Sequence, residues 1–183
     1  MIEMSTAAVH EAGHLVVAYL VGFCPESVRI TTDGDGQLRI DYGELDGVAR
    51  QMMAMDICPE FSTFLRQLNK DAVVDLARRL CVVLVAGGIA EAISRDGPDF
   101  CGKTEVELSG PDLTRAETIS KHFGIDLNQE IMDMYGCLGY TQAWITIEAL
   151  KEAILSNSAN RLDRLAIDVT LESSGFKAFL EQE

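Results

Sequence analysis

The 183-residue sequence has few basic residues and no long apolar run. Its 15 Lys and Arg stand against 29 Asp and Glu, which gives a formal net charge of −14. Most of such a surface repels a polyanion, so we expect no nucleic-acid partner and a chain suited to holding a cation. The longest apolar stretches, 15–23 and 81–93, are too short for a bilayer of about 30 Å. We therefore expect no membrane span, and residues 1–3 lack the basic start of a targeting segment.

Paired cysteine motifs are also missing. The five cysteines, at positions 24, 58, 81, 101 and 137, are widely scattered and form no C-x-x-C pair. This usage is typical of reduced intracellular thiols rather than of a disulfide framework or a cysteine zinc site, so we predict a cytoplasmic protein. The sequence contains no G-x-x-x-x-G-K-[ST] either, so we expect no ATPase activity in this chain.

The remaining composition, 48% hydrophobic and 24% charged, is that of an ordinary globular protein. Apolar residues alternate only in 27–42, around the turn Asp33-Gly34-Asp35-Gly36, and predict a β-hairpin. A calcium-binding EF-hand needs a glycine at the sixth position of its loop, and counting from Asp33 that position is Leu38, so we expect a simple turn. Sequence patterns predict helices over 4–22, 46–55, 60–68, 70–95, 111–124, 127–135, 139–156 and 158–172, and a polar loop over 96–109. We expect a mainly α fold, one compact helical domain over 1–183 with a small β-hairpin.

Two of the three histidines lie four residues apart, in the segment His10-Glu11-Ala12-Gly13-His14. Residues at this spacing share a helix face, so both imidazoles can bind one zinc ion at about 2.0–2.1 Å. Glu11 projects beside them and can take a proton from a zinc-bound water, whose pKa falls to about 7. An H-E-x-x-H segment on a helix therefore indicates a zinc metallopeptidase. The alternative is an amphipathic helix that packs two partly buried histidines.

A catalytic zinc site needs a third protein ligand and one open position. Spacing alone does not identify this ligand, because His122 and every acidic residue other than Glu11 could provide it. His122 equally fits a histidine near a helix C-terminus, where it interacts with the helix dipole.

Three blocks of the sequence resemble the peptidase domain of the FtsH-type, membrane-anchored AAA+ zinc metalloproteases. A weaker stretch is similar to the C-terminal helix pair of that family, so the likeness covers nearly the whole chain. The order and approximate separations of the blocks agree with the family, and their combination makes the resemblance more specific than H-E-x-x-H alone. The blocks are AVHEAGHLVVAYLVG (8–22), VAGGIAEAIS (85–94) and SGPDLTRAETISKHFGI (109–125), and the weaker stretch is 153–176.

The resemblance implies an FtsH-peptidase-like fold in which Asp112 is the third zinc ligand beside His10 and His14. A carboxylate in the first turn of a helix is stabilised there by backbone N–H groups and the helix dipole. Glu91 is the other candidate for this ligand, or else a partner that orients one imidazole.

The second block also contains two glycines, Gly87 and Gly88, which we expect to allow close packing against the H-E-x-x-H helix. The chain departs from the family at three positions: Ile89 replaces an arginine, Ala92 replaces a glutamate, and Pro111 replaces an asparagine. Zinc binding is compatible with these changes, whereas a peptidase without a motor should cleave only unfolded or flexible chains.

Together these features predict a zinc-dependent metalloendopeptidase that hydrolyses peptide bonds of unfolded polypeptides, with Glu11 as the catalytic base. The strand edge near 37–42 is a candidate for pairing with an extended peptide. The alternative is a non-catalytic interaction or regulatory module of the same fold. Either reading allows a homo-oligomer or association with ATPase-bearing relatives.

Overall fold

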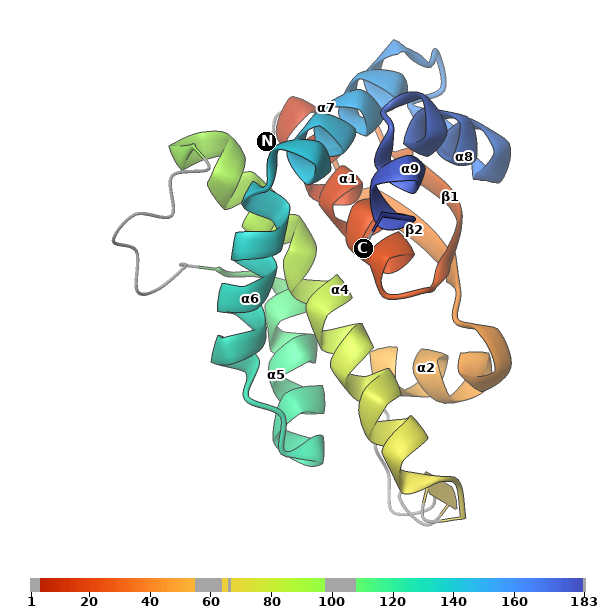
Figure 1. The fold of residues 1–183 in the computed structure, drawn as a ribbon, viewed down its shortest axis with the longest axis vertical. Helices are drawn as coiled ribbons and strands as arrows, with labels where there is room; N and C mark the ends of the chain where they lie inside the picture. The colour runs from red at the N-terminus through yellow and green to blue at the C-terminus, as the bar shows by residue number, and fades with distance from the viewer. Residues whose placement is uncertain (1–3, 55–63, 66, 98–107, 183) are drawn as a thin grey trace.

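A computed structural model describes residues 4–54, 64–65, 67–97 and 108–182 of the chain (Figure 1). The fold is mainly helical with a small antiparallel sheet, which confirms the predicted fold class. In these ranges the helices are α1 (Met4–Leu20), α2 (Asp46–Met53), α4 (Lys70–Asp96), α5 (Pro111–Phe123), α6 (Leu127–Gly139), α7 (Thr141–Ser156), α8 (Arg164–Ser173) and α9 (Phe176–Leu180), with a 3-10 turn η1 (Gly43–Leu45). The strands are β1 (Cys24–Ile30), β2 (Gly36–Asp41) and β3 (Arg161–Asp163).

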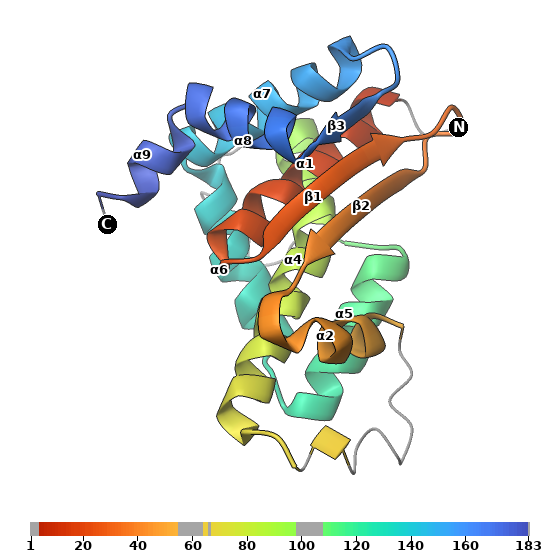
Figure 2. The same cartoon turned by 90° about the vertical axis from the view of Figure 1, so that its right-hand side faces the viewer.

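Helix α1 lies at the centre of the fold and is buried on most sides. Its sequence is apolar nearly all round, as expected of a helix that is covered by neighbours in every direction. Helices α4 and α7 pack against it, and strands β1 and β2 cover another face (Figure 2). A Cβ at Gly13 would lie 2.7 Å from both the Ala86 carbonyl oxygen and the Ala90 Cβ. The glycine therefore allows α1 and α4 to approach closely.

Helix α4 connects this centre to α5 and α6, which pack on it (Figure 1). Helix α5 follows Gly110, whose φ is 108°, and has Pro111 in its first turn. Proline is favoured there because the first N–H groups of a helix have no intrahelical partner. This start places Asp112 in the first turn of α5.

The sheet has the strand order β2-β1-β3. Strands β1 and β2 form the predicted hairpin, with Ile30 opposite Gly36 and Cys24 opposite Asp41. The third strand corrects the prediction of a helix over 158–172, because 161–163 pairs with β1 and α8 starts only at Arg164. Leu162 is buried while its neighbours are exposed, an alternation over three residues that is too short to be recognised as a strand.

Other predicted boundaries differ at the ends of elements. Helix α6 extends to Gly139 instead of ending at 135, and α9 was not predicted. Most of the predicted helix 60–68 and most of the predicted loop 96–109 lie outside the described residues. Among the residues that are described, no helix has both the length and the apolar composition needed to cross a bilayer.

Candidate metal centre

Three side chains from the middle of α1 and the first turn of α5 meet: His10, His14 and Asp112. The two imidazole Nε2 atoms lie 2.9 Å apart, and Asp112 Oδ2 lies 3.4 Å from that of His10 and 3.5 Å from that of His14. Ligand atoms held about 2.0–2.1 Å from a tetrahedral ion lie about 3.4 Å from one another. The two distances to Asp112 match this value, and the separation of the two Nε2 atoms is about 0.5 Å shorter, so the three atoms lie close enough together to share one metal ion.

The opposite nitrogen of each imidazole is already hydrogen-bonded to α4. His10 Nδ1 donates to Glu91 Oε1 at 2.6 Å, and His14 Nδ1 donates to the Val83 carbonyl oxygen at 2.6 Å. Because a carbonyl and a carboxylate oxygen accept, the hydrogen of each neutral ring resides on Nδ1. Both Nε2 lone pairs then face each other and the Asp112 carboxylate. Three electron-pair donors that face one another in this way can bind a cation between them.

The titration of the group agrees with this reading. Burial alone lowers the pKa of His10, but hydrogen bonds to Asp112 and Glu91, together with the charge of Glu11, raise it to about 9. Burial acts in the opposite direction on Asp112, yet hydrogen bonds from the two histidines hold the pKa of its carboxyl well below its usual range. The raised pKa of His10 reports negative charge around its ring, and the lowered pKa of Asp112 reports that the two histidines stabilise its carboxylate.

Gly87 on α4 provides the space at this centre. A Cβ at Gly87 would lie 2.6 Å from Nε2 of both His10 and His14. A Cβ at Gly88 would instead meet the Leu108 side chain at 3.2 Å. The expectation that both glycines pack against the H-E-x-x-H helix is therefore correct for Gly87 and wrong for Gly88, because successive helix residues point about 100° apart.

The second oxygen of Asp112 is held within α5. Arg115 Nη1 donates to Asp112 Oδ1 at 2.9 Å, across one helix turn. Arg115 was not predicted as a site residue, although the i,i+3 spacing of an acid and an arginine on a helix is a recognisable signal. His122, the other histidine considered as a ligand, lies exposed in the last turn of α5 and does not belong to the cluster.

Glu11 lies beside the imidazoles and is 7% exposed. Its Oε2 is buried without a hydrogen-bond partner among the described residues, and burial raises the pKa of its carboxyl. Gly36 of β2 lies against this carboxyl, so that a Cβ at position 36 would overlap Oε1. A buried carboxyl that lacks a partner is unfavourable for folding and is characteristic of functional sites.

A cleft of about 340 Å³ runs beside the centre. Its charged and imidazole groups come from Glu11, His14, Asp112 and Arg115. The rest of its lining is largely apolar and includes β2 and the residue after it, from 36 to 42. At about 3.3 Å per residue, this edge is on the order of 20 Å long.

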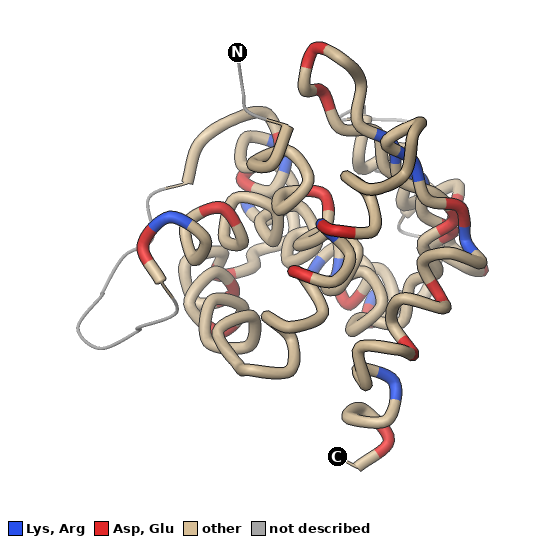
Figure 3. Tube along the Cα trace, turned by 90° about the horizontal axis from the view of Figure 1, so that it is seen from above, with Lys and Arg blue, Asp and Glu red and all other residues tan. Residues whose placement is uncertain are grey.

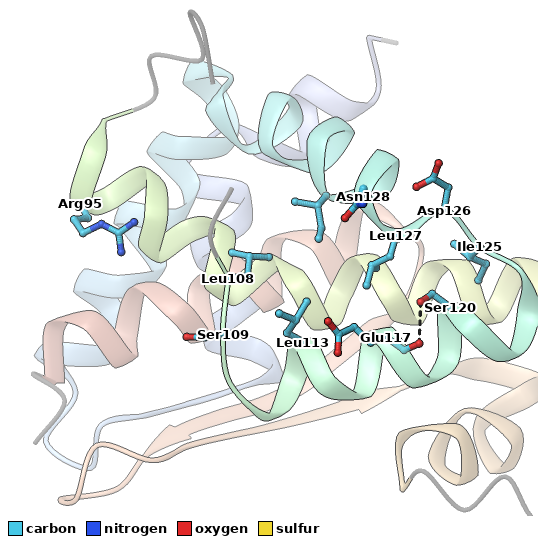
Figure 4. A pocket seen from close by; sticks show the side chains of 11 residues that line it. Arg95, Leu108, Ser109, Leu113, Glu117, Ser120, Ile125, Asp126, Leu127 and Asn128 are labelled. Atoms are coloured by element: carbon cyan, nitrogen blue, oxygen red, sulfur yellow. Dashed lines mark hydrogen bonds between the residues drawn. The ribbon is translucent and has the colours of Figure 1, made fainter. Parts of the chain in front are cut away.

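A larger hollow of about 980 Å³ lies between the end of α4, α5 and α6 (Figure 4). Leu113 and Glu117 of α5 face Leu127 of α6 across it. Its described lining contains neither histidine nor cysteine. Size alone therefore does not mark the candidate site, and the smaller cleft carries the metal-ligating groups.

Comparisons with protein-family models, with curated proteins and with solved structures find no match for this chain. Its function is therefore inferred from the residues and geometry of the cleft.

Proposed function

We propose that this protein is a zinc-dependent metalloendopeptidase of the FtsH-peptidase type. The observation that supports the proposal is the convergence of His10, His14 and Asp112 beside the buried carboxyl of Glu11. Two imidazoles and one carboxylate are a usual ligand set of catalytic zinc and leave one position open. The cluster, with Nδ1 of each histidine engaged by α4, fits such an ion.

A bound zinc ion supplies a Lewis acid that makes water more acidic and polarises a carbonyl group. Glu91 and the Val83 carbonyl hold the two imidazoles in the tautomer that presents Nε2. Glu11 accepts the proton of the attacking water and delivers it to the leaving amide nitrogen. Its raised pKa suits this role, because a base that must later act as an acid works best when its pKa lies nearer to the working pH.

The substrate that fits the cleft is an extended segment of an unfolded polypeptide. Strand β2 is at the edge of the sheet that the described residues form and borders the cleft, so its outer edge can form backbone hydrogen bonds with a bound peptide. A cleft on the order of 20 Å long accommodates about six extended residues. We also propose a cytoplasmic location. Because the sequence has no phosphate-binding loop of its own, we propose that ATPase-bearing relatives associate with it and supply unfolded chains.

The decisive experiment compares the wild-type protein with Glu11→Gln. We expect one zinc per chain in both proteins by elemental analysis, cleavage of casein by the wild type, and a loss of cleavage of at least about 1000-fold in Glu11→Gln. Glu117→Gln is a matched control, because it makes the same change at an exposed position of α5 outside the cleft.

Two outcomes would contradict the proposal. Undiminished cleavage by Glu11→Gln would remove Glu11 from the mechanism. A wild-type protein that binds zinc and leaves unfolded chains intact would be the non-catalytic module instead.

A further inference from the structure

Arg115 lies in the cleft directly beside the candidate metal centre. One Asp112 oxygen faces the imidazoles and the other accepts a hydrogen bond from Arg115 Nη1 at 2.9 Å. The guanidinium is thus one carboxylate away from the metal position, a distance on the order of 7 Å. Its side chain is 38% exposed, and this is its single hydrogen bond to the described residues. Within the part of the chain that the structure describes, the other N–H donors of the guanidinium have no acceptor, so they can bind a ligand.

The charge of the surroundings makes this position unusual. The chain has a net charge of −14, and acidic residues are distributed over the trace (Figure 3). A carboxylate is therefore repelled over most of the surface. Among the described residues that line the cleft, Arg115 is the single Lys or Arg. Guanidinium is the group that binds carboxylates most specifically, through two parallel N–H···O bonds.

We infer that Arg115 binds a carboxylate of the substrate next to the scissile bond and so makes the enzyme prefer acidic peptides. The inference rests on the proposed function and adds a substrate class to it. One extended residue spans about 3.3–3.6 Å, so a guanidinium at this distance from the metal reaches groups on the residue next to the scissile bond. The carboxylate belongs either to an Asp or Glu side chain or to the C-terminus of a short peptide.

The test is a cycle of two enzymes and matched peptides. The reference peptide has Gln on both sides of the scissile bond and an amidated C-terminus. A second and a third peptide replace one or the other Gln with Glu, and a fourth ends one residue after the scissile bond with a free carboxylate. We expect kcat/KM of the wild-type enzyme to be about 10- to 100-fold higher for one of the carboxylate peptides than for its amide counterpart. In Arg115→Gln this ratio falls to about one.

The ratio of kcat/KM for the carboxylate and the amide peptide distinguishes a role of Arg115 in substrate binding from a role in holding Asp112 in place. Loosening Asp112 lowers the rates with the charged and the uncharged peptide alike, so it cancels in the ratio. Arg115→Lys keeps the positive charge and retains part of the preference. Lys121→Gln is the matched control, because it removes one positive charge from the same helix at a position outside the cleft and leaves the ratio unchanged.

Equilibrium binding gives a readout that does not depend on cleavage. We expect the zinc-loaded Glu11→Gln protein to bind the preferred carboxylate peptide at least about 10-fold more tightly than the amide peptide, and to lose this difference when Arg115→Gln is added. If the wild type cleaves neither peptide but this difference is present, the proposed function fails and the carboxylate site stands. If the wild type cleaves casein but shows no Arg115-dependent preference for any carboxylate, the inference is overturned. A uniform loss of rate and zinc affinity in Arg115→Gln also overturns it and leaves Arg115 as a residue that orients Asp112.

Discussion

The two sides of the candidate metal centre are built in different ways. On the side of α1 and α4, the side chains of His14 and His10 are 8% and 25% exposed, and both histidines lie against Gly87 and donate hydrogen bonds to α4. On the side of α5, the Asp112 side chain is 26% exposed and is held by Arg115 from its own helix.

This difference separates packing from charge as ways to position a metal ligand. The histidines are fixed by a helix interface that cannot shift without disturbing the core. The aspartate is fixed by an ion pair near the surface, and such pairs contribute at most about 1 kcal/mol to stability. Changes on the α1–α4 side should therefore affect both folding and metal binding, whereas changes on the α5 side should affect metal binding alone.

The strongest test of this comparison is Gly87→Ala. The added Cβ would displace both imidazoles, so we expect zinc affinity to fall by about 100-fold and the free energy of unfolding of the metal-free protein to fall by about 2 kcal/mol. Chelator competition and urea denaturation measure the two effects. Gly88→Ala is the matched control, because its Cβ meets only the movable Leu108 side chain and alanine is the better helix former. Equal effects of the two substitutions would contradict the assignment of Gly87 to the site.

A smaller loss of affinity should follow from Asp112→Asn on the α5 side. The substitution removes the ligand charge and keeps the shape, so we expect zinc affinity to fall by about 30-fold with a change in unfolding free energy below about 1 kcal/mol. Asp126→Asn provides the control, because Asp126 caps α6 and asparagine caps a helix equally well. Wild-type zinc affinity in Asp112→Asn would exclude this carboxylate as a ligand.

The pH dependence of zinc binding should come from the histidine side. With a pKa of about 9, His10 is protonated at pH 7 in the metal-free protein, and zinc must displace that proton. Below pH 9 we expect apparent zinc affinity to fall by about tenfold per pH unit, while Asp112 stays ionised and contributes no dependence above pH 5. Calorimetry in buffers of different ionisation enthalpy measures the expected release of about one proton per zinc at pH 7.

Removing the Glu91 carboxylate sharpens this result. Glu91→Gln lowers the pKa of His10, because Glu91 contributes to raising it. The pH dependence should therefore begin at a lower pH. An unchanged pH profile in this variant would mean that the displaced proton is not on His10.

The same division explains which parts of the site the sequence reveals. The two histidines lie on one helix, so their spacing alone indicates a shared ligand. Asp112 lies 102 residues from His10, and spacing offers no means to select it among the acidic residues; the family resemblance pointed to it. The Val83 acceptor is a backbone carbonyl, which every residue possesses, so its role has no sequence signal at all.

Within the fold, the predictable parts are the long elements with a clear period, such as the helix that became α4. Strand β3 was missed because its stability comes from pairing with β1, which is more than 130 positions away in the sequence. Asn160, at a φ of 46°, turns the chain just before this strand, and Asp163 then caps α8. The apolar spacing over 158–172, which predicted a helix, gives no sign of these contacts.

The smallest expected effect concerns Glu11 on the α1–α4 side, because burying its carboxylate without a hydrogen-bond partner for Oε2 among the described residues lowers the free energy of unfolding. In the metal-free protein at pH 7, we expect Glu11→Gln to raise the free energy of unfolding by about 1 kcal/mol, because it replaces a buried carboxylate with an uncharged group of the same shape. Urea denaturation in the presence of a chelator measures the difference.

The sign of the pH dependence follows from the raised pKa of Glu11 in the folded protein. Below its unfolded pKa of about 4.3 the carboxyl is protonated in both states, and the stability difference between wild type and Glu11→Gln vanishes. As the pH rises, the unfolded chain ionises first, so the wild type loses stability relative to the variant until the folded carboxyl also ionises. Glu117→Gln, on the exposed face of α5, should leave stability unchanged at both ends of this range. A less stable Glu11→Gln protein at pH 7 would instead show that attraction to His10 and His14 outweighs the burial of the charge, and charge as well as packing would then stabilise the H-E-x-x-H face.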